Sequence, residues 1–267
     1  MRSELTLADL KRLELGILDY IDKVCKENQI TYYIDSGTLL GAVRHNGFIP
    51  WDDDIDIVVD RQDYQKLLSL LAEGSTRYQV LSMYNNENYH YLFAKVIDGE
   101  TELIEDYLPM KEMGVFVDIF PIDHLPSNIV ARRIMQYYIR LMRTFLRIIL
   151  DEISGKNSEN FKQKLVLFIH KRRNWKRIMN IIDLFLTKMS MKETKYKSNI
   201  VASSNPYRDV PTEYFGDPVQ LQFEHSTYYA PRAYKEYLTI LYGDYMTLPS
   251  ESARVSNHSF KAYMRQK

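Results

Sequence analysis

The stretch Trp51-Asp52-Asp53-Asp54-Ile55-Asp56-Ile57-Val58-Val59 combines four carboxylates with an apolar run. Residues 54–59 alternate, so Asp54, Asp56 and Val58 are predicted on one face of a β-strand and three apolar residues on the other. Two carboxylates on one strand face repel each other unless a cation lies between them. A hard divalent cation with oxygen ligands would satisfy both, and magnesium is the usual one beside phosphates. The alternative interpretation is a solvated acidic strand edge.

Two further segments favour the metal site. Ser36-Gly37-Thr38 lies between a predicted strand and the start of a predicted helix, where small residues let backbone N–H groups approach a phosphate. Asp118 is the one carboxylate in the apolar run 115–120, and a buried carboxylate is costly unless it is paired or bound to a metal. Asp118 is therefore predicted as a third ligand beside Asp54 and Asp56.

The other elements follow from hydrophobic periodicity and capping signals. Thr6 with Asp9 has the form of a capping box, which begins a helix that runs to about residue 28. Further helices are predicted at 36–44, 61–73, in two long parts of 127–191, and from Pro231 to Gly243. Strands are predicted at 31–34, 78–83, 91–97, 101–105, 115–120 and 223–229. This order indicates an α+β protein with a mixed sheet.

Charge is unevenly distributed along the 267 residues. Lys plus Arg equals Asp plus Glu at 35 each, yet residues 131–178 contain 13 basic and 3 acidic side chains. The basic segment has three interpretations: a solvated helical insertion, docking on an anionic membrane surface, and nucleic-acid binding. Nucleic acid is not an expected partner, because no recognition motif accompanies the charge.

The predicted organisation is a catalytic core at 1–126, a basic helical insertion at 127–195, and a C-terminal helical segment at 196–267 that completes the active site. The single cysteine, Cys25, excludes an internal disulfide. The N-terminus lacks the apolar stretch of a signal peptide, and no apolar run predicts a transmembrane helix. We therefore expect a cytoplasmic protein, with the basic segment as a means of peripheral attachment to the inner face of the membrane.

The order of Ser/Gly turn, helix, acidic strand and later carboxylate resembles the nucleotidyltransferase superfamily, which has the polymerase beta-like fold. A closer resemblance is to the LicD family. Three segments carry it: Asp35–Ile57, Val117–Asp123, and Tyr242–Pro249 with Arg254 and His258 behind it. Bacterial members of this family resemble phosphocholine transferases that use CDP-choline, and the animal relatives fukutin and fukutin-related protein transfer ribitol phosphate from CDP-ribitol.

The resemblance implies roles for the acidic and small residues. Asp54, Asp56 and Asp118 would hold Mg²⁺, or Mn²⁺ in its place. Asp52 would be a nearby catalytic acidic residue, as a base or an orienting group. Ser36, Gly37 and Thr38 would cradle the donor phosphates.

Four more residues are candidate substrate contacts. Arg44 could hold a phosphate bidentately, and Lys95, on an otherwise apolar strand, could neutralise a diphosphate. Arg254 and His258 follow the tail motif and are expected to approach the active site. The alternative for all four is a structural or surface role.

The implied reaction is metal-dependent transfer of phosphocholine from CDP-choline to a hydroxyl of a lipid-linked, cell-surface glycan precursor of teichoic acid or lipopolysaccharide, with release of CMP. Alternatives are CDP-ribitol or CDP-glycerol as donor, a nucleotidyltransferase that releases pyrophosphate, and a non-catalytic binding protein. A choline head group would need an aromatic cage, with Tyr89, Tyr91 and Tyr107 among the candidates.

Overall fold

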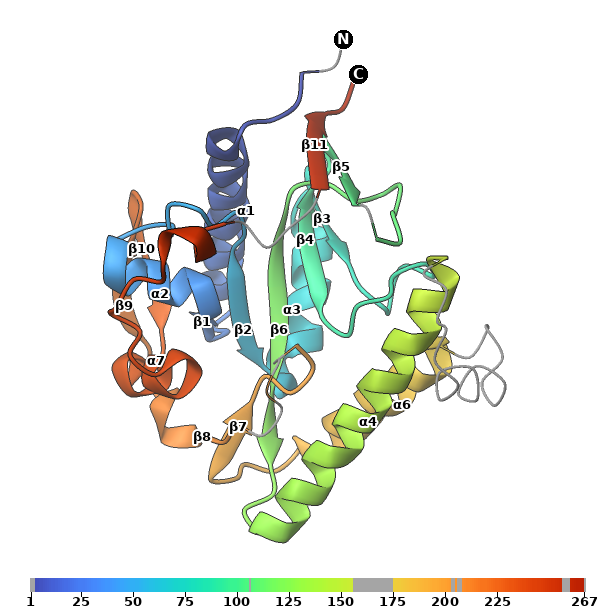
Figure 1. Ribbon diagram of the computed structural model, residues 1–267, viewed down its shortest axis with the longest axis vertical. Helices are drawn as coiled ribbons and strands as arrows, with labels where there is room; N and C mark the ends of the chain where they lie inside the picture. The colour runs from blue at the N-terminus through green and yellow to red at the C-terminus, as the bar shows by residue number, and fades with distance from the viewer. Residues whose placement is uncertain are drawn as a thin grey trace.

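The structure, a computed structural model, describes residues 3–105, 107–155, 175–202, 205, 208–255 and 260–266. A mixed sheet forms its centre (Figure 1). The main strand order is β1 (Tyr32–Ile34), β2 (Asp56–Asp60), β6 (Phe116–Leu125), β4 (Ala94–Asp98) and β3 (Tyr78–Leu81). β2 and β6 are parallel, and the other neighbours on this path are antiparallel. The predicted α+β class with a mixed sheet is confirmed.

Two helices, α1 (Leu7–Glu27) and α3 (Arg61–Gly74), lie behind the sheet in Figure 1. The predicted capping box begins α1: the Asp9 backbone N–H donates to Thr6 Oγ1, and the Thr6 N–H donates to the Asp9 carboxylate. Asp60 caps α3 by accepting from the backbone of the second helical residue. Buried aliphatic residues of both helices pack on β2 and β6, and this fixes the two strands that carry Asp56 and Asp118.

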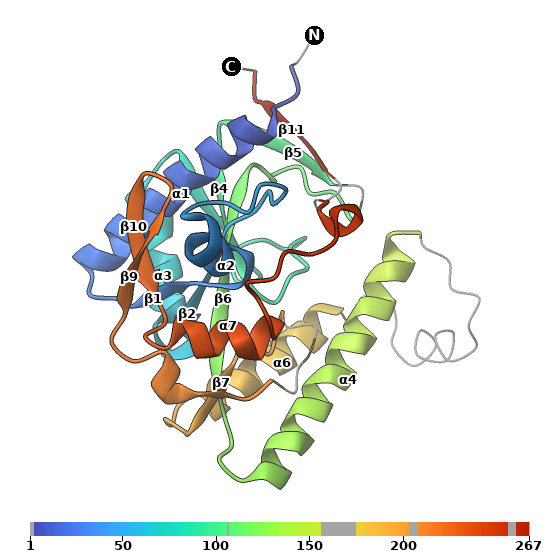
Figure 2. The same cartoon turned by 60° about the vertical axis from the view of Figure 1, so that its left-hand side comes forward.

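In its described residues the basic insertion contains two helices, on either side of residues 156–174. α4 (Ile129–Ile153) and α6 (Trp175–Met189) pack on each other at one side of the molecule (Figures 1 and 2). They share a second core of buried apolar residues: Met135, Ile139, Leu146, Ile149, Ile178, Met179, Ile182 and Leu186. Residues 156–174, which include much of the basic run, lie outside the described part of the chain. Of the helices that the structure describes, none combines the length and hydropathy needed to span a bilayer.

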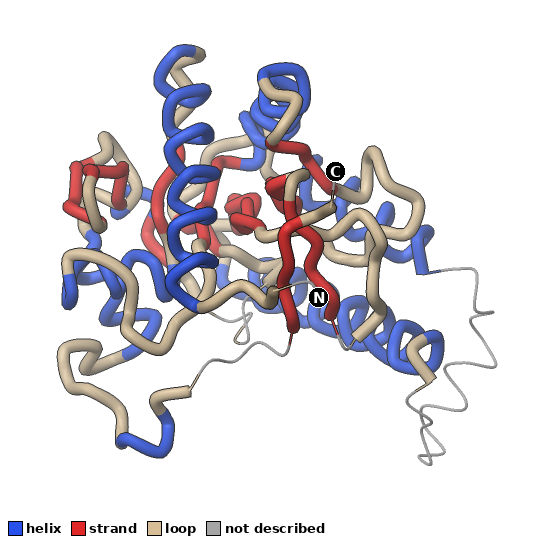
Figure 3. Tube along the Cα trace, turned by 90° about the horizontal axis from the view of Figure 1, so that it is seen from above, coloured by secondary structure: helices blue, strands red, loops and turns tan. Residues whose placement is uncertain are grey.

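The C-terminal segment contains more strand than predicted. β7 (Tyr196–Ser198) pairs with the end of β6 and with β8 (Val210–Pro211), and β11 (Phe260–Met264) pairs with β5 (Thr101–Glu105). Its helix α7 (Tyr234–Tyr242) begins three residues after the predicted start at Pro231 and ends before Gly243, which has a φ of 71° at the predicted C-terminal cap position. Figure 3 shows most of the strands grouped in the middle with helices around them, and one separate pair of strands at the edge.

Several predicted strands have different bounds: β4 begins at Ala94 and not at residue 91, and β6 continues to Leu125 and not to residue 120. β2 begins at Asp56, so Asp54 lies in the loop before the strand, although Asp118 N already donates to Ile55 O at 2.9 Å. The predicted strand 223–229 is a hairpin of β9 (Val219–Phe223) and β10 (Ser226–Ala230). Glu224 has a φ of 53° and turns the chain there, which the alternation of the flanking residues did not reveal.

Candidate active site

Strand pairing brings three predicted site residues together. Asp56 on β2 is the register partner of Asp118 on β6, and Asp118 is the register partner of Lys95 on β4. Lys95 Nζ donates to Asp118 Oδ1 at 2.7 Å and lies 3.4 Å from the centroid of the Phe116 ring. Lys95 is 3% exposed, so this ion pair is buried. The lysine predicted to neutralise a diphosphate is thus held by a predicted metal ligand.

Carboxylates accumulate around Asp56. Burial, and then the charges of Asp54 and Asp118, raise the pKa of Asp56 well above its usual value. Asp52, Asp53 and Asp54 each place an oxygen within 4.8 Å of the others in the loop before β2. Among the described residues, this is the one group of three potential metal ligands whose oxygens lie so close to one another. The oxygens of the predicted triad, Asp54, Asp56 and Asp118, do not all meet this distance.

A buried carboxyl group of α1 adds to this charge. Glu14 is 3% exposed, and its Oε2 has no hydrogen-bond partner among the described residues. Burial, followed by Asp54 and Asp53, raises the pKa of Glu14 well above its usual value. The loop before β2 is therefore surrounded by carboxyl groups on more than one side.

The start of α2 (Ser36–His45) is fixed to the first residue of β2. Asp56 N donates to Thr38 Oγ1 at 2.9 Å, and Asp35 N donates to Asp56 O at 2.9 Å. Both bonds tie the predicted phosphate cradle to the acidic strand. The N-terminus of α2, where helix N–H groups favour an anion, therefore lies directly beside the carboxylates.

Two small residues of this cradle occupy constrained positions. A Cβ at Gly37 would lie 2.5 Å from Asp52 Oδ2, so the close approach of this carboxylate requires glycine. Ser36 has a φ of 48°, which is uncommon for a residue with a side chain. The cradle is thus shaped around the predicted catalytic residue Asp52.

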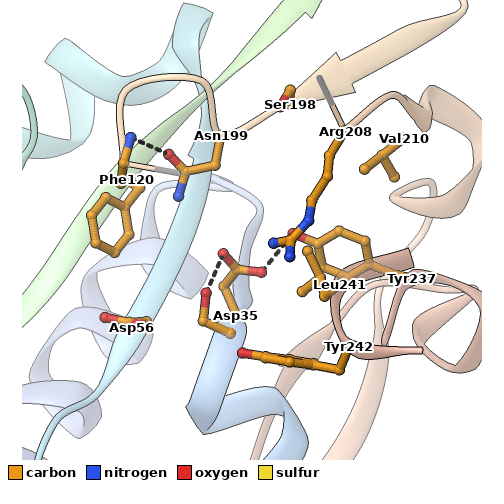
Figure 4. Close-up of a pocket in the computed structure, with 12 residues that line it drawn as sticks. Asp35, Asp56, Phe120, Ser198, Asn199, Arg208, Val210, Tyr237, Leu241 and Tyr242 are labelled. Atoms are coloured by element: carbon orange, nitrogen blue, oxygen red, sulfur yellow. Dashed lines mark hydrogen bonds between the residues drawn. The ribbon is translucent and has the colours of Figure 1, made fainter. Parts of the chain in front are cut away.

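A cavity of about 500 Å³ opens beside Asp56 (Figure 4). Asp35 forms part of its wall, is 2% exposed, and accepts a hydrogen bond from the Tyr237 hydroxyl at 2.6 Å. Burial raises the pKa of Asp35, while the bond from Tyr237 acts in the opposite direction. The wall includes Asp35, Ser36, Asp56, Phe120, Ser198, Asn199, Arg208, Tyr237, Leu241 and Tyr242. Arg208 points toward Asp35 and is the one cation among the described residues of this wall (Figure 4).

The C-terminal segment contacts Arg44 of α2 and brings Arg254 close to Trp51, beside the acidic stretch. Arg44 Nη1 donates to Tyr245 O at 3.1 Å, and the Arg254 guanidinium lies 5.6 Å from the centroid of the Trp51 ring. Burial and the charge of Arg254 lower the pKa of Arg44. Within the described ranges neither arginine has a carboxylate within 4.0 Å. His258 lies outside the described residues.

Several cavity residues were not predicted from the sequence. Asn199 and Arg208 come from a polar stretch without periodicity, so no pattern pointed to them. Tyr242 opens the tail motif, which was the available signal. The proposed cage residues Tyr89, Tyr91 and Tyr107 do not line this cavity, and Tyr89 is buried elsewhere at 1% exposure.

Comparison with known proteins finds a matching family. The family described as LicD/FKTN/FKRP, nucleotidyltransferase domain, matches residues 29–147. That range includes the start of α2, the acidic strand, Lys95 and Asp118.

Individual relatives extend the likeness. Lipopolysaccharide cholinephosphotransferase LicD of Haemophilus influenzae is 30% identical over 275 aligned positions, which cover 98% of this chain and 99% of that protein. Ribitol 5-phosphate transferase FKRP of Homo sapiens is 39% identical over 44 positions, 16% of this chain and 9% of that one. An uncharacterized protein of Rickettsia typhi is 56% identical over 105 positions, 38% of this chain and 30% of that one. The chain belongs to the LicD family and is a phosphotransferase, as the motifs predicted.

Proposed function

We propose that this enzyme transfers phosphocholine from CDP-choline to a hydroxyl of a cell-surface glycan precursor and releases CMP. The observation that carries the proposal is the Asp56–Asp118 pair beside the cavity, in a chain similar over 98% of its length to a lipopolysaccharide cholinephosphotransferase. The proposed acceptor is a teichoic acid or lipopolysaccharide sugar on a lipid carrier at the inner face of the membrane.

Asp54, Asp56 and Asp118 are the proposed ligands of Mg²⁺, or of Mn²⁺. The raised pKa of Asp56 supports this, because neighbouring carboxylates repel each other without a cation. Carboxylate oxygens are also the donors that Mg²⁺ prefers. A bound metal would offset negative charge on the phosphates of the donor. Lys95 positions Asp118, and Asp52 is proposed to orient the acceptor hydroxyl or accept its proton.

The diphosphate of the donor needs cationic partners besides the metal. The N-terminus of α2 with Ser36, Gly37 and Thr38 is proposed to receive one phosphate. Arg44 and Arg254 are proposed to contact the diphosphate, since two guanidinium groups so close together favour an anion between them. His258 retains its predicted role as a substrate contact.

The mixed sheet is proposed to have the nucleotidyltransferase, polymerase beta-like fold. Its support is the carboxylate pair on parallel neighbours β2 and β6, and the helix that begins beside Asp56. The proposed divisions remain a core at 1–126, an insertion at 127–195, and a segment at 196–267 that completes the site.

A CMP-release assay across CDP-choline, CDP-ribitol, CDP-glycerol and CDP-ethanolamine, each with Mg²⁺ and with a chelator, tests the reaction. We expect CMP from CDP-choline with Mg²⁺ and none with the chelator. Pyrophosphate released from CTP would instead identify a nucleotidyltransferase. Calorimetry of Mg²⁺ binding tests the metal separately: Asp56→Asn should lose binding, and the exposed control Asp217→Asn should keep it.

CDP-ribitol is the second candidate donor. The similarity to ribitol 5-phosphate transferase covers 44 residues, against nearly the whole chain for the cholinephosphotransferase. A preference for CDP-ribitol in the same assay would replace the proposed donor and leave the proposed metal site unchanged.

A further inference from the structure

Helix α4 exposes an apolar stripe on the face opposite its packing with α6. We call Val130, Ile134, Tyr137 and Leu141 the outer stripe; they are 63%, 65%, 61% and 36% exposed. Their spacing of three and four residues places them along one side of the helix. Met135, Ile139 and Leu146 lie on the other side, buried against α6. α4 is therefore apolar on two faces, and the protein interior covers one of them.

Arginines follow one flank of the outer stripe. Arg133, Arg140 and Arg147 recur every seven residues, and no Asp or Glu occurs between Ser127 and Leu150. The Arg147 side chain is 83% exposed and lies 3.9 Å from Asp151. The Arg133 side chain pairs with Asp209 at 3.0 Å and is still 44% exposed. The outward side of α4 is therefore apolar with a basic border.

We propose that the outer stripe and its arginines dock α4 on an anionic phospholipid surface, with the helix in the plane of the interface. Apolar residues on one side and basic residues beside them are what such a surface binds. A second copy of the chain is a poorer occupant, because antiparallel two-fold pairing of this helix would bring the arginine rows of both copies together. This proposal does not depend on the identity of the donor.

The position of α4 agrees with such docking. The helix stands at the side of the molecule, apart from α2 and α7, in both ribbon views (Figures 1 and 2). The residues that line the cavity come from other elements. The outer stripe therefore contributes none of the described residues of the cavity wall.

Co-sedimentation with vesicles tests the proposal on the full chain. Vesicles of phosphatidylcholine and phosphatidylglycerol in equal parts should bind the protein, and pure phosphatidylcholine should bind it at least about tenfold less. The double variant Ile134→Asp with Tyr137→Asp should lower binding to the anionic vesicles by about tenfold or more. Arg140→Gln with Arg147→Gln should reduce the preference for anionic vesicles and its sensitivity to salt.

Matched controls separate docking from loss of fold. Ile104→Asp changes a residue that is 48% exposed on β5 and should bind as the wild type does, as should Arg12→Gln, whose side chain is 76% exposed. Circular dichroism should show all variants folded. Absence of wild-type binding, equal binding to both vesicles, or unchanged binding of the outer-stripe variant would overturn the proposal. So would light scattering that shows a dimer which the outer-stripe variant converts to a monomer.

Discussion

The two ends of the parallel strands β2 and β6 both carry carboxylates, but they differ in how the protein neutralises them. At the beginning of the strands, Asp56 lies opposite Asp118, and Lys95 donates a hydrogen bond to Asp118. The loop before β2 adds Asp52, Asp53 and Asp54. Burial, and then the charges of Asp54 and Asp118, raise the pKa of Asp56.

At the far end the carboxylates have dedicated cations. Arg61 donates to both oxygens of Asp123 at 2.7 and 3.0 Å, and to Asp183 at 2.9 Å. Burial alone would lower the pKa of Arg61, but Asp123 and Asp183 raise it. Asp60 forms a short ion pair with Lys197. Because Asp183 belongs to α6, this network joins the sheet to the basic insertion.

We interpret the comparison as separating charges that hold the fold from charges that belong to the proposed metal site. Buried ion pairs are costly to break, since one ion is left without compensation. Carboxylates kept close together despite repulsion lower stability and are retained where a cation or substrate binds. The far end therefore has the character of a structural joint, and the beginning of the strands that of a functional site.

The largest expected effect is on activity at the beginning of the strands. Asp56→Asn should lower the rate of CMP release by at least about a thousandfold, because it removes a proposed metal ligand. It should not lower the free energy of unfolding, since it also relieves repulsion. Asp118→Asn should lose activity equally but also lose stability, because Lys95 loses its buried partner. Full activity in Asp56→Asn would refute the comparison.

The far end should show the opposite result. Asp123→Asn leaves Arg61 partly uncompensated and should cost about 3–5 kcal/mol in urea unfolding. CMP release per folded molecule should stay near the wild-type rate. Arg12→Met, which breaks the exposed pair with Asp9, should cost less than about 1 kcal/mol. A far-end variant that is stable but inactive would contradict the division of roles.

His90 is expected to make folding stability depend on pH in the acidic range. Burial lowers the pKa of His90 to about 4, and the residue is 6% exposed. The unfolded chain therefore binds this proton first, so stability is complete above about pH 6.5 and falls by about 3 kcal/mol as the pH approaches 4. His90→Gln should remove this part of the slope in thermal melts recorded across that range. An unchanged slope would contradict the assignment of this pH dependence to His90.

The smallest effect concerns the shape of the phosphate cradle. Gly37→Ala puts a Cβ 2.5 Å from Asp52 Oδ2, so Asp52 must shift. We expect a stability cost of about 1 kcal/mol and a loss of about tenfold in CMP release. Gly16→Ala is the control, because its Cβ would meet the Tyr78 hydroxyl at 2.9 Å, far from the carboxylates. Equal rates for both variants would show that the position of Asp52 is not critical.

The local parts of the fold were predictable from local signals. A capping box and apolar spacing located α1, and alternation located most of β2. The pairing of Asp56 with Asp118 was predicted only as a shared metal site, since no pattern sets the register of strands so distant in sequence. β11 was missed because its pairing with β5 is long-range and its alternation is weak.

The site was predictable where a residue departed from its surroundings. Asp118 and Lys95 are single charges in apolar strands, and this pattern predicted both as site residues. Their contact with each other depends on the antiparallel register of β4 and β6. Asn199 and Arg208 lie in a polar stretch where one more polar residue carries no information, so their place in the cavity wall emerged only from the fold.

The hydrogen bond from Tyr237 to Asp35 has a consequence for folding during synthesis of the chain. The two residues are 202 positions apart, so the cavity wall closes only after nearly the whole polypeptide has been made. Asp118 likewise joins Asp56 only after β6 has emerged. A nascent or prematurely terminated chain therefore displays its acidic loop without an assembled site, and we expect fragments that end before α7 to be unable to consume nucleotide donors.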